Sequence, residues 1–278
     1  MNIITGMETN NKMAILVLSC DKYSAAWDNF FDIMEKFWPD RNFPCYLATD
    51  SKEYHREGVK VIHFGNIRQW SKCARIALEQ IESPYISLFL EDAFIYKKID
   101  NNIINEDLDF VEKNHVDFLT LETKRAFIPE EQWEYVADNI VKIPPHHRYG
   151  VETSAAIWDK NYFIKKLSET DCSAWEFEVN RCKEAQSEKG HDGIILYDAR
   201  GPYNISPIEV IRVGKWWPGA IKYFHELGYD INPGNIPIMN VWEVLGDKIR
   251  RKVSGIKFAR KPIKKVAKLM GFPVYSDD

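Results

Sequence analysis

Short apolar segments alternate with helical stripes in the first 95 residues, and this alternation limits the fold more than any other feature of the sequence. The apolar segments have the length and composition of strands and cover Ala14–Leu18, Cys45–Ala48, Val59–Phe64 and Tyr85–Leu90. Apolar residues recur at helical spacing over 27–37 and over 70–81, the second stripe with Ser71 as its expected cap. The resulting order β-α-β-β-α-β predicts an α/β fold with a mostly parallel, Rossmann-like central sheet flanked by helices.

Acids directly follow three of these four predicted strands. Asp21 and Asp50 come after the first two strands, and Glu91 and Asp92 stand side by side after the fourth. Because ligands bind at the carboxyl ends of parallel strands, we expect the four acids to converge on one edge of the sheet. Two adjacent carboxylates repel each other unless a cation or a hydrogen-bonded ligand lies beside them. Their oxygens suit Mg²⁺ or Mn²⁺; alternatively, one acid caps the following turn and the other is solvated.

The stretch CSAWEFEVN, residues 172–180, offers a second pair of acids at the start of a helix predicted over 174–185. Glu176 and Glu178 are two positions apart, so on a helix only one of them can face a site. An acid beside Trp175 would be partly desolvated, which raises the pKa of a carboxyl toward that of a general base. We therefore predict Glu176 as the base and Glu178 as the second candidate. The alternative is that both acids complement the helix dipole.

The remainder of the body continues the mixed pattern. We predict a helix over 105–113, a strand over 118–122, a loop over 143–149, and a helix over 161–168 introduced by 155–158. Residues 201–240 contain five prolines and many aromatic residues, which indicates irregular structure wrapped over the core and not a second domain.

Several classes of protein are disfavoured by composition. No apolar stretch approaches the roughly 18–20 residues of a membrane span, and the N-terminus lacks the pattern of a signal peptide. Five cysteines, an odd number without a C-x-x-C pair, argue against a disulfide framework or a zinc site. They suit a reducing compartment, and we expect a cytoplasmic protein.

The C-terminal tail differs from the body in charge. Residues 1–246 hold 27 Lys/Arg and 38 Asp/Glu, a net of −11, whereas residues 247–278 hold 10 and 3, a net of +7. Apolar residues recur at helical spacing within 247–271, which is typical of an interfacial membrane helix. We predict a domain over 1–246 and a basic amphipathic tail over 247–278 that binds an anionic membrane surface. The alternative is a terminal helix packed on the acidic body. Nucleic acid is not expected as a partner, since no second basic surface or recognised module is present.

A series of motifs adds a resemblance to this picture. In order they are ILVLSCDKYSAAWDNFFDIMEKFWPD, FPCYLATD, QWSKCARIALEQIESPYISLFLEDAFI, SAAIWDKNYFIKKL, AWEFE and VIRVGKWWPGA. Together they resemble bacterial GT-A-like glycosyltransferases of surface-polysaccharide gene clusters, over about residues 13–220. The resemblance implies transfer of a sugar from a nucleotide-sugar donor of the UDP, GDP or CMP type to a glycan acceptor. It also implies an inverting reaction with a Glu base. The basic tail adds the expectation of a lipid-linked acceptor at the inner face of the cell membrane.

The same resemblance assigns roles to residues. Those implied in nucleotide or donor binding are Ser19, Asp21, Asp50, Trp70, Lys72, Arg75, Glu91, Asp92 and Lys215. Glu91 and Asp92 would also hold Mn²⁺ or Mg²⁺, and Tyr149 and Trp175 would contact the acceptor. The usual metal motif of the family has two acids separated by one residue, whereas here the acids are adjacent and Ala93 follows. We therefore expect metal use to be weak or optional.

The phosphates of such a donor need positive charge near the acids. Five cations are candidates from their place in predicted loops and helix starts: Lys22, Lys72, Arg75, Arg212 and Lys215. Two other functions stay open from the residues alone. A glycoside hydrolase would also use two carboxylates, and a nucleotide- or carbohydrate-binding protein would tolerate a degenerate metal motif.

Overall fold

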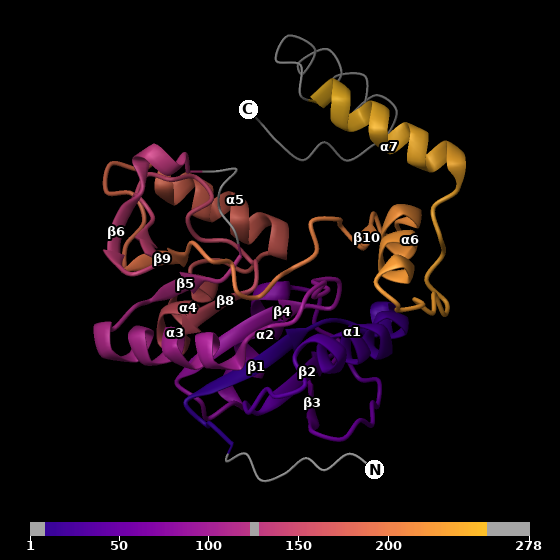
Figure 1. Ribbon diagram of the computed structural model, residues 1–278, viewed down its shortest axis with the longest axis horizontal. Helices are drawn as coiled ribbons and strands as arrows, with labels where there is room; N and C mark the ends of the chain where they lie inside the picture. The colour runs from indigo at the N-terminus through magenta and orange to yellow at the C-terminus, as the bar shows by residue number, and fades with distance from the viewer. Residues whose placement is uncertain (1–8, 123–127, 255–278) are drawn as a thin grey trace.

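A nine-stranded mixed sheet forms the centre of the protein (Figure 1). The computed structural model describes residues 9–122 and 128–254, so the predicted tail beyond residue 254 lies outside the described residues. In spatial order the strands are β3 (Val59–His63), β2 (Cys45–Thr49), β1 (Met13–Leu18), β4 (Tyr85–Leu90), β8 (Ala156–Asp159), β5 (Phe118–Thr120), β9 (Ile195–Asp198), β7 (Ile140–Lys142) and β6 (Glu134–Ala137). A separate short hairpin pairs β10 (Ile211–Arg212) with β11 (Lys215–Trp216).

Seven of the nine strands run in one direction, and β8 and β7 run against them. The parallel register places Leu18 of β1 beside both Ala48 of β2 and Leu90 of β4. The three strands therefore end at the same level, and the residues that follow them emerge at one edge of the sheet. The predicted α/β fold with a mostly parallel sheet is confirmed.

Helices cover both faces of the sheet. Their bounds are α1 (Ser24–Phe37), α2 (Trp70–Glu79), α3 (Asn101–Asn114), α4 (Lys160–Ser168), α5 (Ala174–Ala185), α6 (Pro218–Glu226) and α7 (Val241–Ser254), with 3-10 turns η1 (Asp21–Tyr23) and η2 (Glu130–Gln132). Along β1, Ile15 and Val17 face a core shared with α1, α3 and α6, whereas Ala14 and Leu16 face a core shared with α2, α4 and α5. This alternation is the period of two that a strand buried on both faces requires.

Two local predictions are wrong, and one segment without a predicted element proves to be a strand. Ser71 does not cap α2, because the helix begins after Gln69 without a side-chain cap, and the buried Ser71 Oγ instead accepts a hydrogen bond from the Cys172 backbone N–H (2.9 Å). Residues 156–159, for which no element was predicted, form a strand that pairs antiparallel with both β4 and β5. Residues 218–226 form a helix within the segment predicted to be irregular, with Pro218 in its first turn, where its fixed φ and missing N–H cost nothing.

One helix, α7, overlaps the start of the predicted tail. α7 runs from Val241 to Ser254, so the predicted boundary between residues 246 and 247 lies inside one helix. Figure 1 shows α7 beyond α6, away from the central sheet. None of the helices within 9–122 and 128–254 has the length and apolar character needed to cross a membrane.

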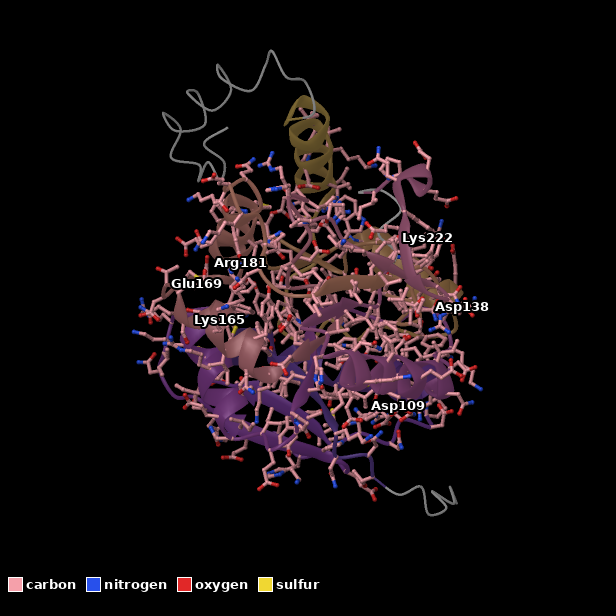
Figure 2. The ribbon with its side chains drawn as sticks, turned by 90° about the vertical axis from the view of Figure 1, so that its left-hand side faces the viewer. Asp109, Asp138, Lys165, Glu169, Arg181 and Lys222 are labelled. Carbon is pink, nitrogen blue, oxygen red and sulfur yellow. The ribbon has the colours of Figure 1, made fainter. Side chains whose placement is uncertain are left out.

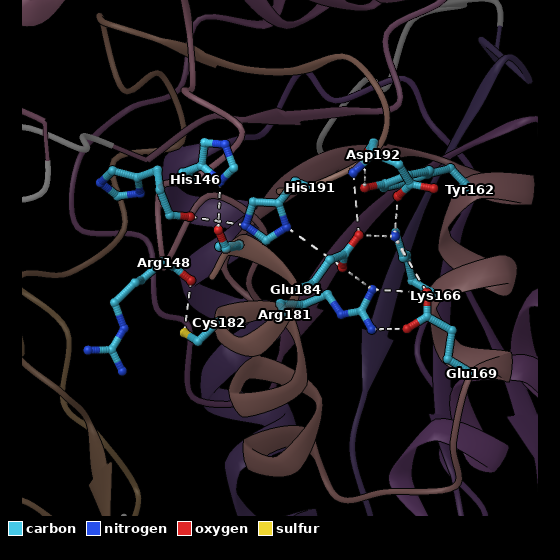
Figure 3. A network of polar contacts seen from close by, with 12 residues as sticks. His146, Arg148, Tyr162, Lys166, Glu169, Arg181, Cys182, Glu184, His191 and Asp192 are labelled. Carbon is cyan, nitrogen blue, oxygen red and sulfur yellow. Dashed lines mark hydrogen bonds and ion pairs between the residues drawn. The ribbon is translucent and has the colours of Figure 1, made fainter. Parts of the chain in front are cut away.

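A buried ionic network joins α4 to α5 (Figure 3). Lys166 is 2% exposed and pairs with Glu184 (Nζ to Oε1, 2.5 Å) and with Asp192. Arg181, also 2% exposed, pairs with Glu184 (2.6 Å) and with Glu169. Figure 2 shows Arg181 and Glu169 close together on one side of the molecule. Burial alone would raise the pKa of Asp192, but hydrogen bonds from lysines lower it below the ordinary value, so the network is held in its ionised form.

The same region fixes the segment 143–150. The His146 ring contacts the Ala185 carbonyl (3.0 Å), and the Cys182 thiol donates to the Arg148 carbonyl (2.8 Å). The network therefore sets the position of α5 relative to the loops beside it.

Two adjacent lysines on α4 allow a matched test of this network. Lys166→Ala should lower the free energy of unfolding by about 2–5 kcal/mol, because it removes a buried side chain and leaves the partly buried Glu184 carboxylate with one cation fewer. Lys165→Ala also removes a pair with Asp192, but Lys165 is 61% exposed, so its loss should cost no more than about 1 kcal/mol. Urea denaturation near neutral pH measures both. Equal losses in the two variants would show that burial of the network does not stabilise the fold.

Candidate functional site

The loops after β1 and β2 are tied to each other at the carboxyl edge of the sheet. The Asp21 carboxylate accepts hydrogen bonds from Thr49 Oγ1 (2.9 Å), from Ser51 N and Oγ (3.2 and 2.9 Å) and from Lys52 N (3.0 Å). In return, Asp50 Oδ2 accepts from the Asp21 backbone N–H (2.7 Å). Burial acts to raise the pKa of Asp21, but these hydrogen bonds lower it. Asp21 therefore shapes the two loops, and both of its oxygens are engaged in doing so.

Glu91 and Asp92 lie at the end of β4 beside these loops. Glu91 is 9% exposed, and burial followed by the charge of Asp92 raises its pKa. Burial and the charge of Glu209 raise the pKa of Asp92. The Ser19 hydroxyl accepts from the Trp27 indole N–H (2.8 Å) and hydrogen-bonds Glu91, which offsets part of the cost. Across the described ranges neither carboxyl forms an ion pair with Lys, Arg or His, so their charge is left for something else to balance.

The antiparallel strand β8 brings Glu178 to the same edge. Ala156 pairs with Leu88 of β4, so Thr153 and Glu91, each three residues further toward the edge, lie at the same end of their strands. Glu178 Oε1 accepts hydrogen bonds from Thr153 N (3.2 Å) and Thr153 Oγ1 (2.5 Å). Glu178 is therefore the acid of α5 that is fixed against the carboxyl edge.

Glu176 has a different environment. Its carboxylate accepts from Ser173 N and Oγ (2.8 and 2.9 Å), and Ser173 Oγ accepts from Glu176 N (3.2 Å), which is a capping box. The hydrogen bonds from Ser173 lower the pKa of Glu176, and Trp175 is 44% exposed. The expected rise in pKa from desolvation by Trp175 is wrong.

Most of the cations predicted for the phosphates are engaged with acids. Lys72 and Arg75 both pair with Asp171 (3.0 and 3.2 Å), and Lys215 pairs with Glu243 on α7. Arg212 pairs with Glu209 and Asp247 (3.0 and 3.2 Å). These contacts place Lys72 and Arg75 along α2, and Lys215 and Arg212 against α7.

The aromatic candidates are spread over the molecule. Trp70 packs against Phe177 (ring centroids 5.5 Å apart) at the margin of the core under α2 and α5. Its Nε1 is buried without a hydrogen-bond partner. Tyr149 is 41% exposed, in the loop after β7, and Trp175 is exposed in the first turn of α5. The structure thus gathers Ser19, Asp21, Asp50, Glu91, Asp92 and Glu178 at one edge. Trp70 lies at the start of α2, against the first turn of α5.

Three residues at this edge were not selected from the sequence. Glu122 follows β5 and accepts from the Ala155 backbone N–H (2.9 Å), and Thr153 holds Glu178. Tyr23 lies beside the acids, since burial and then the charge of Glu91 raise its pKa. Glu122 is the last residue of the strand predicted over 118–122 and lies two residues after β5, so a search for acids at strand ends would have found it. Nothing in the local sequence marks Thr153 or Tyr23.

Glu91 and Asp92 fit a divalent cation only in part. Their oxygens are the ligands that Mg²⁺ and Mn²⁺ prefer, and both groups lack a protein cation. No group of three or more His, Cys, Asp or Glu side chains able to hold a metal ion occurs within the part of the chain that the structure describes. A metal here would take its remaining ligands from a bound phosphate or from water.

Comparisons with known proteins extend these observations little. No protein-family model matches the chain, and no curated protein matches it. Among solved structures it is similar to residues 1–349 of TarS from S. aureus, with 14% identity over 67% of this chain and 60% of that one and a TM-score of 0.41. It is also similar to an active-site mutant of LgtC (11% identity, 64% and 67% covered, TM-score 0.36). A third similar structure is 4-diphosphocytidyl-2C-methyl-D-erythritol synthase from Anaerococcus prevotii, with 8% identity over 79% of this chain and 97% of that one and a TM-score of 0.43.

The chain thus spans 60% of the TarS fragment and 36% of the longer TarS chain that it matches. At these identities and TM-scores the likeness carries no functional conclusion, and the strand order of the sheet defines the fold.

The raised pKa of Glu91 predicts an unusual pH dependence. A carboxyl whose pKa is higher in the folded state stabilises that state at acid pH and loses this contribution as pH rises through the folded pKa. Glu91→Gln should therefore raise the free energy of unfolding of the ligand-free protein by about 1–3 kcal/mol near pH 8, and not near pH 5. Glu176→Gln should instead lower the free energy of unfolding near pH 8, because the pKa of Glu176 is below its ordinary value in the folded state. Denaturation curves at the two pH values measure this, and parallel behaviour of Glu91→Gln and wild type would contradict it.

Proposed function

We propose that this protein is a glycosyltransferase that moves a sugar from a nucleotide-sugar donor to a glycan acceptor. The observation that carries the proposal is the Glu91–Asp92 pair at the end of β4, in which Glu91 is buried and neither carboxyl has a cation partner among the described residues. The chain adds β2 and β3 on one side of β1 and then crosses to add β4 on the other side. In open α/β sheets, ligands bind at the carboxyl ends of the strands where the strand order reverses in this way. The carboxyl pair follows β4 at this point of the sheet, where a sugar diphosphate with its counter-charge would remove the cost of the repulsion between the two carboxylates.

The donor site uses both strand-end loops. Asp50 and the backbone that Asp21 organises line the nucleotide side, and Ser19 orients Glu91. Glu91 and Asp92 lie where the sugar diphosphate would be. A divalent cation, if used, would be held by these two carboxylates and by the diphosphate, and it would supply positive charge to the leaving group. We propose that metal use is optional, because the two acids are adjacent and the described residues provide no third ligand.

Glu178 is the better placed base. Its hydrogen bonds from Thr153 fix it at the carboxyl edge, whereas the Glu176 carboxylate is used in the capping box. In the proposed inverting step, an acceptor hydroxyl loses its proton to the base while its oxygen bonds to the anomeric carbon. The bond between that carbon and the donor phosphate oxygen breaks, and the electron pair leaves on the nucleotide.

The proposal predicts that Asp92→Asn lowers turnover at least about tenfold, since a charge-assisted contact of roughly 1.5–3 kcal/mol is lost. The assay measures nucleotide release and glycoside formation from UDP-, GDP- and CMP-linked sugars. Asp109→Asn is the matched control, because Asp109 is exposed on α3 (Figure 2). Wild-type protein that cleaves glycosides but consumes no nucleotide sugar would favour a hydrolase. Binding without turnover would favour a binding protein.

The assignment of the base predicts a contrast between two neighbours. Glu178→Gln should lower kcat by about 10²–10⁴, the usual contribution of a general base. Glu176→Gln should stay within a few-fold of wild type, because Glu176 would act only on the helix end. The acid limb of the kcat–pH profile should disappear in Glu178→Gln. If Glu176→Gln is inactive and Glu178→Gln is not, the assignment is reversed.

We also propose that the protein works at the inner face of the cell membrane on a lipid-linked acceptor. Four apolar residues on α7 are exposed: Val241 (79%), Trp242 (80%), Leu245 (47%) and Ile249 (54%). Asp247, on the same helix, is buried and pairs with Arg212. α7 thus packs on the body with one side and leaves an apolar side uncovered, at the start of the basic segment 247–271. An apolar stripe joined to Lys and Arg suits an anionic lipid surface.

This proposal predicts that the intact protein floats with anionic liposomes, less so at high salt, since surface charges are screened beyond about 10 Å at 0.1 M. Trp242→Ser should weaken flotation at least about tenfold, because it removes the largest apolar side chain of the stripe. Tyr135→Ser is the control, since Tyr135 is an exposed aromatic residue on β6. An intact protein that ignores anionic liposomes at low salt would refute the membrane part alone.

A further inference from the structure

The carboxyl edge carries several acids and needs positive charge before it can accept a diphosphate. Four of the five predicted cations are paired with acids: Lys72, Arg75, Arg212 and Lys215. Lys22 differs from them, because it forms no ion pair with any residue that the structure describes. Lys22 belongs to η1, directly after β1, and so it starts from the same edge as the acids.

Lys22 lies against Tyr23 and the turn of the β10–β11 hairpin. Its Nζ is 5.2 Å from the centroid of the Tyr23 ring. A Cβ placed on Gly214 would lie 3.5 Å from Lys22 Nζ and 3.6 Å from the Tyr23 hydroxyl. The ammonium, the phenol and the turn therefore form one continuous surface, built from segments about 190 residues apart in the chain.

Residues of this surface and of the hairpin beside it interact electrostatically with the carboxyl pair. The charges of Glu91 and Asp92 act on the Tyr23 hydroxyl, and the charge of Glu209, just before the hairpin, acts on Asp92. Glu209 is itself paired with Arg212 of β10 (3.0 Å). The hairpin is thus linked to the acids in two ways: its turn lies beside Tyr23, and Arg212 of β10 pairs with Glu209.

The turn has a backbone feature that packing does not explain. Val213 has φ +51° and Gly214 has φ +74°, as the two-residue turn between β10 and β11 requires. Glycine adopts this conformation freely, but for a β-branched residue such as valine it is strained. Val213 is 74% exposed, so burial does not impose the conformation. Strain of this kind beside a site points to a role of the turn in that site.

We propose that Lys22, Tyr23 and the Val213–Gly214 turn form the phosphate-binding wall of the donor site, with the Lys22 ammonium as the group that binds the diphosphate of a nucleoside diphosphate. The inference rests on the proposed function and names the residue that recognises the donor's charge. Lysine suits this task because its ammonium is a compact point charge on a flexible stem, with three donors for phosphate oxygens. The same charge offsets the repulsion between the phosphates and Glu91 and Asp92.

Titration calorimetry of the full chain tests the inference with UDP, GDP and their nucleosides. Lys22→Gln should weaken nucleoside diphosphate binding at least about tenfold and leave nucleoside binding unchanged, while Lys22→Arg keeps most of the affinity. Lys113→Gln is the matched control, since Lys113 is an exposed lysine at the end of α3, at the opposite edge of the sheet. Unfolding midpoints of the three variants should match wild type, because both lysines are exposed.

The outcomes separate the inference from the proposed function. Wild-type protein that binds no nucleoside diphosphate overturns both. Wild-type binding that Lys22→Gln leaves within twofold overturns the inference and leaves the proposed function standing. Equal weakening of nucleoside and diphosphate by Lys22→Gln also overturns it, because Lys22 would then act on the base or on the loop. Loss confined to the diphosphate, with rescue by Lys22→Arg, supports it.

Discussion

Two adjacent carboxyl groups at the end of β4, one buried and one partly buried, are the constraint on which the site depends. Glu91 and Asp92 cannot be ionised together at low cost, because burial and mutual repulsion both favour the protonated form. The protein does not relieve this with an ion pair among the described residues. The pair directly follows β4, a central strand that is hydrogen-bonded to β1 on one side and to β8 on the other. A site kept in this condition is prepared for a ligand that brings positive charge or accepts protons from it.

The rest of the edge is held by contacts that lie away from it. The network of Lys166, Arg181, Glu184 and Asp192 fixes α5 against α4, and α5 carries Glu178 to Thr153. Lys166 and Arg181 are as buried as core side chains, so a shift of α5 would leave charges without partners. The fixed position of Glu178 at the edge is therefore secured by residues on α4 and further along α5.

The sequence predicted the edge because the edge depends on local patterns. Asp21, Asp50, Glu91 and Asp92 each follow a strand, and parallel strands bring such residues together whatever else the chain does. Two further features distinguish the roles of Glu176 and Glu178. Ser173 and Glu176 have the S-x-x-E spacing of a capping box, which is visible in the sequence. The contact of Glu178 with Thr153 joins two loops through the tertiary structure, and no local pattern announces it.

The sequence also did not show which acid each cation pairs with, and this pairing decides what each cation can do. Arg75 meets Asp171 across 96 positions of the chain, and Lys215 meets Glu243 on a helix outside the sheet. These pairs leave Lys22 beside the acids, and they also connect two surfaces. Arg212 and Lys215 flank the turn that lies on Lys22 and Tyr23, and their partners Asp247 and Glu243 belong to α7. The proposed membrane helix and the proposed phosphate wall therefore share one hairpin. A lipid surface that fixes α7 would also fix the turn, so that the donor site would be most ordered where a lipid-linked acceptor is present.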